Sequence, residues 1–466
     1  MRGAGVFEQV GAAGDGPVAA SPSRRPPSRG TLNPARLLAT GFAAVITFGT
    51  FLLTLPPATT DGRGLPVVDA LFTATSATCV TGLTVLDVSA VLTTFGQVVV
   101  LLLIQVGGLG VMTVTTLFVY AIGRRISLRS DMTISESLGQ PRLASTGHLI
   151  RDVALLTLVV ESVGALILTA AFSADFPLGR ALYYGVFHSV SAFCNAGFSL
   201  FGPNLLDYVT NVPVNLTTIS LIVVGGLGFV VLSEILALRR GRRLSLHSRV
   251  VLKATAVLIV VGTLSVLAFE FANPATLGAL SPGGKFLAAL FQSVTPRTAG
   301  FNTVAVGSLL QPTLLILTIL MFIGASPGST GGGIKTTTFV TLLASVRSAL
   351  RRREDVEMGE RRLPQETTTK AWVITALSAG LVLTAIIILL ATEGAPLMDV
   401  TFEAVSAFGT VGLSTGLTPK LTVAGRVLLS LVMYAGRVGP LTLAVALTRQ
   451  DRPAGWRLPE ERVIVG

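Results

Sequence analysis

Four short glycine-containing loops recur along this chain and constrain its fold more than any other feature. Their glycines, Gly82, Gly197, Gly300 and Gly412, lie about 110 residues apart. Each glycine precedes Leu or Phe and follows an apolar run that contains Ser or Thr. Because a repeat of near-constant length reflects a repeated structural unit, we expect four loops around one axis. Loops that direct backbone carbonyls at an axis can replace the hydration shell of a cation.

The segments around each loop are those of a membrane protein. Only 13% of the 466 residues are charged, whereas soluble proteins carry about 25%, and several apolar runs are long enough to cross a bilayer. In each repeat a long apolar run is followed by a helix too short to cross, then by the loop and a second long run. We therefore predict an all-α membrane protein of four parallel helix–pore helix–helix repeats around a central pore, with the pseudo-fourfold symmetry of potassium channels. The predicted parts are a flexible tail 1–33, repeat one 34–125, repeat two 148–243, repeat three 249–353, repeat four 370–448 and a C-terminal tail 449–466.

The basic residues predict how the repeats are oriented. Most of the 35 Lys and Arg residues lie in the two tails and in the connections between repeats. Excess Lys and Arg in short loops marks the cytoplasmic side. Both termini are therefore expected in the cytoplasm of a multi-pass plasma-membrane protein, with the glycine loops opening outward. This distribution assigns the net charge of +11 to membrane topology and argues against a nucleic acid partner.

The four glycine loops are the candidate ion-binding site. Bare backbone at membrane depth is tolerated only where it is buried in protein or lines a wet cavity. A hydroxyl residue precedes each glycine by five or six positions (Ser76, Ser191, Thr295 and Ser406) and is expected to bond the loop backbone. The alternative is that the small residues only allow close helix packing. The candidate potassium-binding residues are Thr78, Cys79, Val80, Thr81 and Gly82, Cys194, Asn195, Ala196 and Gly197, Arg297, Thr298, Ala299 and Gly300, and Gly409, Thr410, Val411 and Gly412.

The second apolar run of repeat three is broken at residues 324–336, which we call the interrupting segment. Its five glycines and one proline exclude a regular helix. In a membrane, such a backbone must face a cavity or be buried in protein. A static kink is the plain interpretation of this segment.

Residue types that often carry chemistry give no enzyme site here. The two cysteines, Cys79 and Cys194, lie three residues before their loop glycines, and we interpret them as small buried thiols rather than as a bridge. The three histidines are not clustered. The run Gly331–Thr336 lacks the glycine spacing and the preceding strand of a phosphate-binding loop.

Four polar side chains fall within or beside apolar runs, where an ionised group needs protein or water around it. Arg437, below a cation filter, could repel a dehydrated K⁺ and donate to carbonyls of the interrupting segment, or it could satisfy carbonyls of its own neighbourhood. Lys335 could face the ion pathway or extend to the cytoplasmic interface. Glu161 has no evident partner and is equally consistent with a structural role, whereas Gln105 is expected to bond a neighbouring helix.

Three motifs carry a resemblance to a known family: the glycine loops, the run Ser326–Thr336, and Gly436-Arg437-Val438-Gly439-Pro440. Over residues 35–448 the chain resembles the ion-translocating subunits of the Trk/Ktr/HKT superfamily of cation transporters, and its length is most like that of the Ktr branch. The resemblance implies a selectivity filter with one glycine per repeat. It also implies potassium as the ion, because part of the plant branch has Ser in place of the first glycine and prefers sodium.

The resemblance further implies a gate and partners. The interrupting segment would lie under the filter as a gate, and its glycines would allow two conformations. The implied partners are a second copy in a homodimer, a cytosolic ring of nucleotide-binding regulatory subunits and the lipid bilayer. No cofactor is implied in this chain; K⁺ is the transported ion and Na⁺ a candidate activator. The gate residues would be Gly324, Ser326, Pro327, Gly328, Ser329, Thr330, Gly331, Gly332, Gly333, Lys335 and Arg437.

We therefore expect potassium uptake across the cell membrane, driven mainly by the membrane potential. One alternative is a sodium- or proton-coupled carrier with a midplane site at the broken helix. Another is a non-conducting membrane scaffold. A saturable flux linked to Na⁺ or H⁺ at zero potential would favour the carrier, and an absence of flux in liposomes would favour the scaffold.

Overall fold

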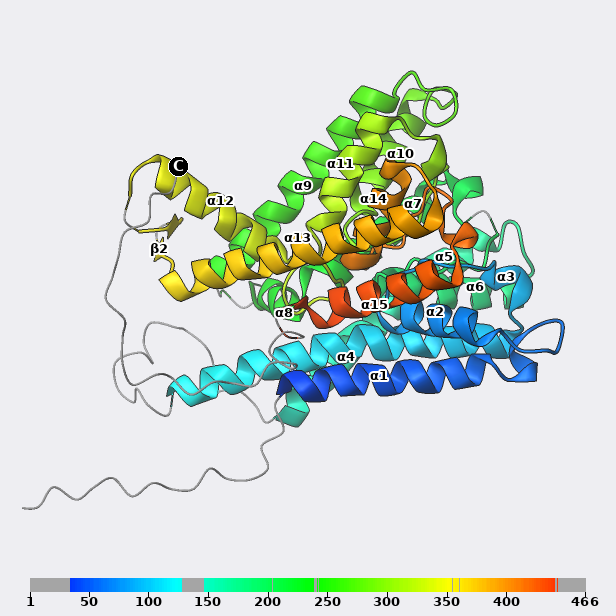
Figure 1. The fold of residues 1–466 in the computed structure, drawn as a ribbon, viewed down its shortest axis with the longest axis horizontal. Helices are drawn as coiled ribbons and strands as arrows, with labels where there is room; N and C mark the ends of the chain where they lie inside the picture. The colour runs from blue at the N-terminus through cyan, green and yellow to red at the C-terminus, as the bar shows by residue number, and fades with distance from the viewer. Residues whose placement is uncertain are drawn as a thin grey trace, which may run out of the picture.

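The computed structural model describes residues 34–127, 146–202, 204–238, 241, 243–353, 355–359, 361–440 and 442. These residues form a helical bundle, with one small hairpin of β1 (Glu357–Met358) and β2 (Arg361–Arg362) at one end (Figure 1). Among them, three helices are long and apolar enough to cross a membrane, and a bent pair makes a fourth candidate. This confirms the all-α fold class. The predicted tails 1–33 and 449–466 lie outside the described residues.

The helices follow the predicted order in all four repeats. Repeat one has α1 (Pro34–Leu53), the short helix α2 (Val67–Thr78), the single turn α3 (Val88–Val91) and α4 (Thr94–Ser127). Repeat two has α5 (Thr146–Phe172), the short helix α6 (Leu178–Phe193), α7 (Val212–Leu227) and α8 (Phe229–Leu238). Repeat three has α9 (Leu246–Glu270), the short helix α10 (Pro282–Val294), α11 (Gln311–Phe322) and α12 (Thr336–Leu350). Repeat four has α13 (Gln365–Glu393), the short helix α14 (Leu397–Gly409) and α15 (Val423–Val438).

A proline marks the start of each short helix. Pro66, Pro177 and Pro396 are the N-cap residues of α2, α6 and α14, and Pro282 is the first residue of α10. Proline suits the start of a helix because its fixed φ is already helical and its missing N–H would have no partner in the first turn. The chain therefore encodes the start of each short helix locally.

The helix that follows the glycine loop in each repeat packs against the short helix of the next repeat. The contacting pairs are α4 with α6, α7 with α10, α11 with α14, and α15 with α2. The last pair joins repeat four to repeat one, so the repeats form a closed ring. In Figure 1, α15 lies beside α2 although they come from opposite ends of the colour scale. This closure is the predicted pseudo-fourfold arrangement.

In repeats one, two and four, glycines in the helix after the loop allow that helix to approach the short helix of its own repeat closely. The glycines are Gly107, Gly225 and Gly436, and a Cβ atom on each would overlap a backbone carbonyl at the end of the short helix of the same repeat. The three carbonyls belong to Thr78, Phe193 and Phe408, respectively. Because this contact recurs, the mid-helix glycine follows the loop glycine at a nearly constant spacing in the sequence.

One break in the helices is not evident in the sequence. Repeats one and two share the pattern Gly-Gly-Leu-Gly, yet α4 is continuous through Gly110 whereas the chain bends by 103° between α7 and α8. The bend is at Gly228, whose φ of 90° is in the left-handed half of conformational space. The next N–H, that of Phe229, donates to the Gly328 carbonyl of the interrupting segment (3.1 Å) and not to its own helix. A tertiary hydrogen bond therefore replaces a helical one.

Candidate functional site

The four glycine loops have one shared backbone conformation. The φ angles of Gly82, Gly197, Gly300 and Gly412 are 97°, 69°, 74° and 93°. The residues two positions earlier are also left-handed, with φ of 57° at Val80, 62° at Asn195, 71° at Thr298 and 51° at Thr410. A left-handed conformation is uncommon for residues other than glycine, and rare for a β-branched side chain. Four copies of it point to a geometry that the surrounding structure imposes.

The loop glycines meet one another in a closed cycle. A Cβ atom added at Gly197 would lie 2.7 Å from the carbonyl oxygen of Ala299, and one at Gly300 would lie 2.5 Å from that of Val411. A Cβ atom at Gly412 would overlap the carbonyl of Thr81, and one at Gly82 the carbonyl of Ala196. Each glycine thus lies against the carbonyl of the residue that precedes the loop glycine of the following repeat. The four loop backbones therefore surround one axis and leave no room for side chains at the glycines.

The predicted hydroxyl residues brace these loops, which confirms that expectation. The N–H groups of Gly82 and Gly412 donate to the hydroxyls of Ser76 (3.0 Å) and Ser406 (3.1 Å). In the other two repeats, the hydroxyls of Ser191 and Thr295 donate instead to the carbonyls of Phe198 (2.8 Å) and Phe301 (2.5 Å). Hydroxyls suit both arrangements because they donate and accept.

A cavity of about 420 Å³ opens on one side of the ring. All four loop glycines line it, together with residues that follow them, such as Leu83, Phe198, Asn302 and Leu413. One carboxylate, that of Asp87, also lines it; one oxygen of Asp87 accepts from the Ser89 N–H (2.8 Å) at the start of α3. The ring of backbone therefore forms the floor of an open vestibule.

The other predicted loop residues are buried around this floor. The hydroxyls of Thr78, Thr81 and Thr410 have no hydrogen-bond partner among the described residues. Cys79 and Cys194 are buried free thiols, as expected. Gly409 is the last residue of α14, against the Met321 carbonyl. Repeat three has Arg297 at the place of Cys79, Cys194 and Gly409. Its long side chain is buried, and its Nε has no partner within the described part of the chain.

The interrupting segment lies directly against the glycine loops. A Cβ atom on Gly331 would overlap the hydroxyl of Thr298, and one on Gly332 would overlap that of Thr410. The segment is held from repeat two by hydrogen bonds from the Ser326 N–H to the Gly226 carbonyl (3.1 Å) and from the Thr330 N–H to the Gly225 carbonyl (3.3 Å). The Thr330 hydroxyl also donates to the backbone carbonyl of Phe193 at the end of α6 (3.2 Å). The segment thus packs against residues that precede the loop glycines, and none of its residues lines the vestibule.

Arg437 joins the interrupting segment to repeat one. Its guanidinium donates to the Thr330 carbonyl and, through Nη2, to the Gly107 carbonyl of α4 (2.8 Å). The side chain is only 5% exposed. The expected donation to the segment is confirmed. The Nζ of Lys335 donates to the Gly331 carbonyl (2.7 Å), a contact within the segment, and the two expectations for Lys335 stay predictions.

Gln105 bonds a neighbouring helix, as expected. The Nε2 of Gln105 donates to Glu161 Oε2 (3.3 Å), which gives Glu161 the partner that the sequence did not identify. The thiol of Cys194 lies 3.8 Å from Glu161 Oε1. The two residues are far apart along the chain, and only the packing of α4 on α5 brings them together.

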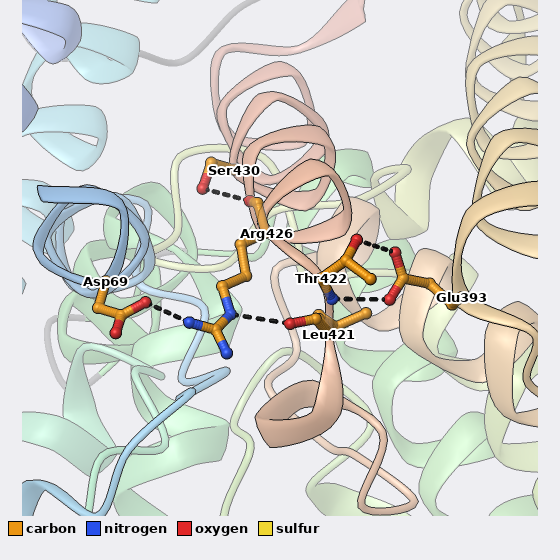
Figure 2. A network of polar contacts seen from close by, with 6 residues as sticks. All are labelled: Asp69, Glu393, Leu421, Thr422, Arg426 and Ser430. Carbon is orange, nitrogen blue, oxygen red and sulfur yellow. Dashed lines mark hydrogen bonds and ion pairs between the residues drawn. The ribbon is translucent and has the colours of Figure 1, made fainter. Parts of the chain in front are cut away.

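A polar network that the sequence analysis missed closes the ring between repeats four and one (Figure 2). Arg426, on α15, pairs with Asp69 in the first turn of α2 (2.5 Å) and donates its Nε–H to the Leu421 carbonyl (3.0 Å). Beside it, Glu393 at the end of α13 accepts from both the N–H (2.8 Å) and the hydroxyl (2.7 Å) of Thr422. A charged residue at the end of an apolar run is the signal that could have located Glu393.

Glu270 has the equivalent role in repeat three. This last residue of α9 is fully buried and accepts from the Leu310 N–H (2.9 Å) and the Thr313 hydroxyl (2.5 Å), at the start of α11. A carboxylate is favourable at a helix start because it satisfies N–H groups that lack helical partners. In repeats three and four, a carboxylate at the end of the first helix therefore caps the start of α11 or α15.

Comparisons with known proteins agree on one group. The family model for TrkH, described as a cation transport protein, matches residues 36–455. The chain is 41% identical over 433 residues to Ktr system potassium uptake protein B of Bacillus subtilis, covering 93% of this chain and 97% of that protein. It is 37% identical over 444 residues to the potassium/sodium uptake protein NtpJ of Enterococcus hirae, covering 94% and 98%. The crystal structure of the potassium transporter TrkH from Vibrio parahaemolyticus superposes with a TM-score of 0.71 at 20% identity, covering 93% of this chain and 88% of that one, which shows a shared fold.

Proposed function

Because this chain belongs to the TrkH family of cation transport proteins, we propose that it carries potassium into the cell as the membrane subunit of a Ktr-type system. The names of its relatives support the ion, and the helices long enough to span a bilayer support the location. The inward direction follows from the membrane potential, since one charge crossing about 100 mV gains about 2.3 kcal/mol.

The observation that carries the proposal is the closed cycle of the four loop glycines. Backbone carbonyls at the ring, such as those of Thr81 and Ala196, would replace the water around K⁺. The buried hydroxyls of Thr78, Thr81 and Thr410, which have no partner among the described residues, would supply further oxygen atoms in the same loops. Gly82, in place of serine, fits a preference for potassium over sodium.

The interrupting segment is the proposed gate. It is packed against Thr298 and Thr410 on the side of the ring away from the vestibule, so K⁺ leaving the ring would meet it. Its hydrogen bonds to Gly225, Gly226 and Arg437 would hold the closed conformation of this gate. A second conformation would exchange these bonds for others, which the glycines of the segment allow.

The partners and orientation complete the proposal. A cytosolic ring of nucleotide-binding subunits would shift the gate between its conformations, and two copies of this chain would form a dimer. The excess of Lys and Arg in the connections between repeats supports a cytoplasmic position for both termini. Na⁺ would act as an activator and not as the main cargo.

The test is rubidium uptake into proteoliposomes that contain the purified protein. We expect uptake that follows an imposed inside-negative potential, competes with K⁺ more strongly than with Na⁺ and is stimulated by Na⁺. The coupled carrier remains the second candidate because the name of one relative includes sodium and a helix is broken at mid-span. Concentrative uptake at zero potential, driven by a Na⁺ or H⁺ gradient, would establish the carrier; no uptake under any condition would rule out both.

A further inference from the structure

Glu161 is a buried carboxylate directly behind the glycine loop of repeat two. It belongs to α5 and is 7% exposed. Its two oxygens face different donors: Oε2 accepts from the Gln105 amide of α4 (3.3 Å), and Oε1 lies 3.8 Å from the Cys194 thiol of the loop. The same thiol lies 3.8 Å from Gln105 Oε1, so Gln105 and Glu161 together surround it. Among the described residues it has no ion-pair partner. The carboxylate therefore connects two helices and one loop.

The surrounding packing makes this connection tight. A Cβ atom on Gly108 of α4 would lie 2.7 Å from Cys194 Sγ, so the thiol is confined between α4 and the carboxylate. The backbone carbonyl of Glu161 accepts from the Ser189 hydroxyl of α6 (2.7 Å), which fixes α5 against the short helix that leads into the loop. A shift of the Glu161 side chain would therefore displace the Cys194 side chain.

Repeat one provides an internal comparison. Cys79 has the same place in its loop as Cys194, but no carboxylate or amide bonds its thiol in the described structure. Ile46 precedes Gly82 by the same number of residues as Glu161 precedes Gly197. Both Ile46 and Cys79 belong to an apolar cluster. Since an apolar residue fills this place in repeat one, packing alone does not require a carboxylate, whose burial is unfavourable.

We propose that Glu161 is a positioning residue for the repeat-two loop and that it contributes to cation selectivity through that loop. Its two oxygens restrain Cys194 and Gln105 together, and the next three residues, Asn195 to Gly197, reach the ring. Selectivity depends on where the ring carbonyls lie and how far they move. Glu161 does not itself contact the ion. This inference rests on the proposed function.

The first experiment compares Glu161→Leu and Glu161→Gln with Thr157→Val. Thr157 lies one turn earlier on α5, is buried, and its hydroxyl has no partner among the described residues, so its replacement controls for a polar-to-apolar change on the same helix. The measurement is competition of Na⁺ with rubidium uptake in proteoliposomes. We expect K⁺-over-Na⁺ preference to fall about fivefold in Glu161→Leu, as for the net loss of one ordinary hydrogen bond. Glu161→Gln keeps one acceptor oxygen and should lose less, and Thr157→Val should match the unmodified protein.

The second experiment does not require transport. Methyl methanethiosulfonate labelling of the purified protein, followed by mass spectrometry, reports the reactivity of Cys194 and Cys79 in one sample. In Glu161→Leu, Cys194 should react about fivefold faster for the same lost interaction, while Cys79 stays unchanged. If Glu161→Leu does not fold, Gln105→Leu removes the other half of the contact and should give the same two changes.

Unaltered selectivity and unaltered Cys194 labelling in the folded variants would overturn the inference while leaving the proposed function intact. Selectivity that falls equally in Thr157→Val would also overturn it, because the effect would then be general to α5. If the unmodified protein takes up no rubidium, the proposed function fails, and the labelling experiment still decides whether Glu161 holds the loop.

Discussion

Replacing Arg437 by alanine tests the gate most directly. The guanidinium makes two hydrogen bonds, one to the Thr330 carbonyl of the interrupting segment and one to the Gly107 carbonyl of α4. Only the first must break when the segment leaves the pathway. A hydrogen bond to a charged group stabilises a structure by about 1.5–3 kcal/mol, so its loss should raise the ratio of open to closed forms by about tenfold to a hundredfold.

The assay is the initial rate of rubidium uptake in proteoliposomes at fixed potential and protein density. Arg437→Ala should raise this rate, with the gain limited once the open form predominates. Arg437→Lys keeps the positive charge but cannot reproduce the planar fork that reaches two carbonyls, so it should give an intermediate rate. Arg426→Ala removes a guanidinium from the same helix, where it bonds Asp69 and Leu421, and should not raise the rate.

An unchanged or lower rate in Arg437→Ala, with thermal unfolding and elution like those of the unmodified protein, would refute the reasoning. The interrupting segment would then be a static part of the structure, and Arg437 would only satisfy buried carbonyls.

Four further outcomes are expected. Deleting Gly328–Gly332 should raise the rate of rubidium uptake and leave selectivity unchanged. Combined with Arg437→Ala, it should raise the rate by less than the sum of the two separate effects, because both act on one barrier; full additivity would argue for two barriers. Gly82→Ser should admit Na⁺ in a growth competition, because a side chain at this position overlaps the next loop; unchanged selectivity would remove Gly82 from the filter. Arg426→Met should lower the unfolding free energy by about 1–3 kcal/mol, since it leaves the partly buried Asp69 without its charge partner; detergent melts that do not shift would assign the pair no role in ring closure. A cysteine at Arg352 should be labelled only from the cytoplasm, and labelling from outside would contradict parallel repeats.

Local sequence signals determined the elements of this protein. Each short helix begins at a proline, and each loop contains a glycine that needs a positive φ. Among the described residues, three helices and one bent pair are long and apolar enough to span a bilayer. These properties depend on a few neighbouring residues and on the bilayer, so the sequence predicts them without knowledge of tertiary contacts. The fourfold recurrence then predicted the ring, because equivalent units in one chain pack in equivalent ways.

Only the tertiary structure identified the partners of several polar side chains. Arg426 and Asp69 are 357 positions apart, and Gln105 reaches Glu161 only because α4 packs on α5. The same is true of the bend at Gly228, since the N–H that follows it bonds the interrupting segment, whereas α4 continues through the matching Gly110. Such contacts depend on the order in which the repeats close around the axis. No local propensity encodes that order, and one pattern of residues can therefore be a straight helix in repeat one and a broken one in repeat two.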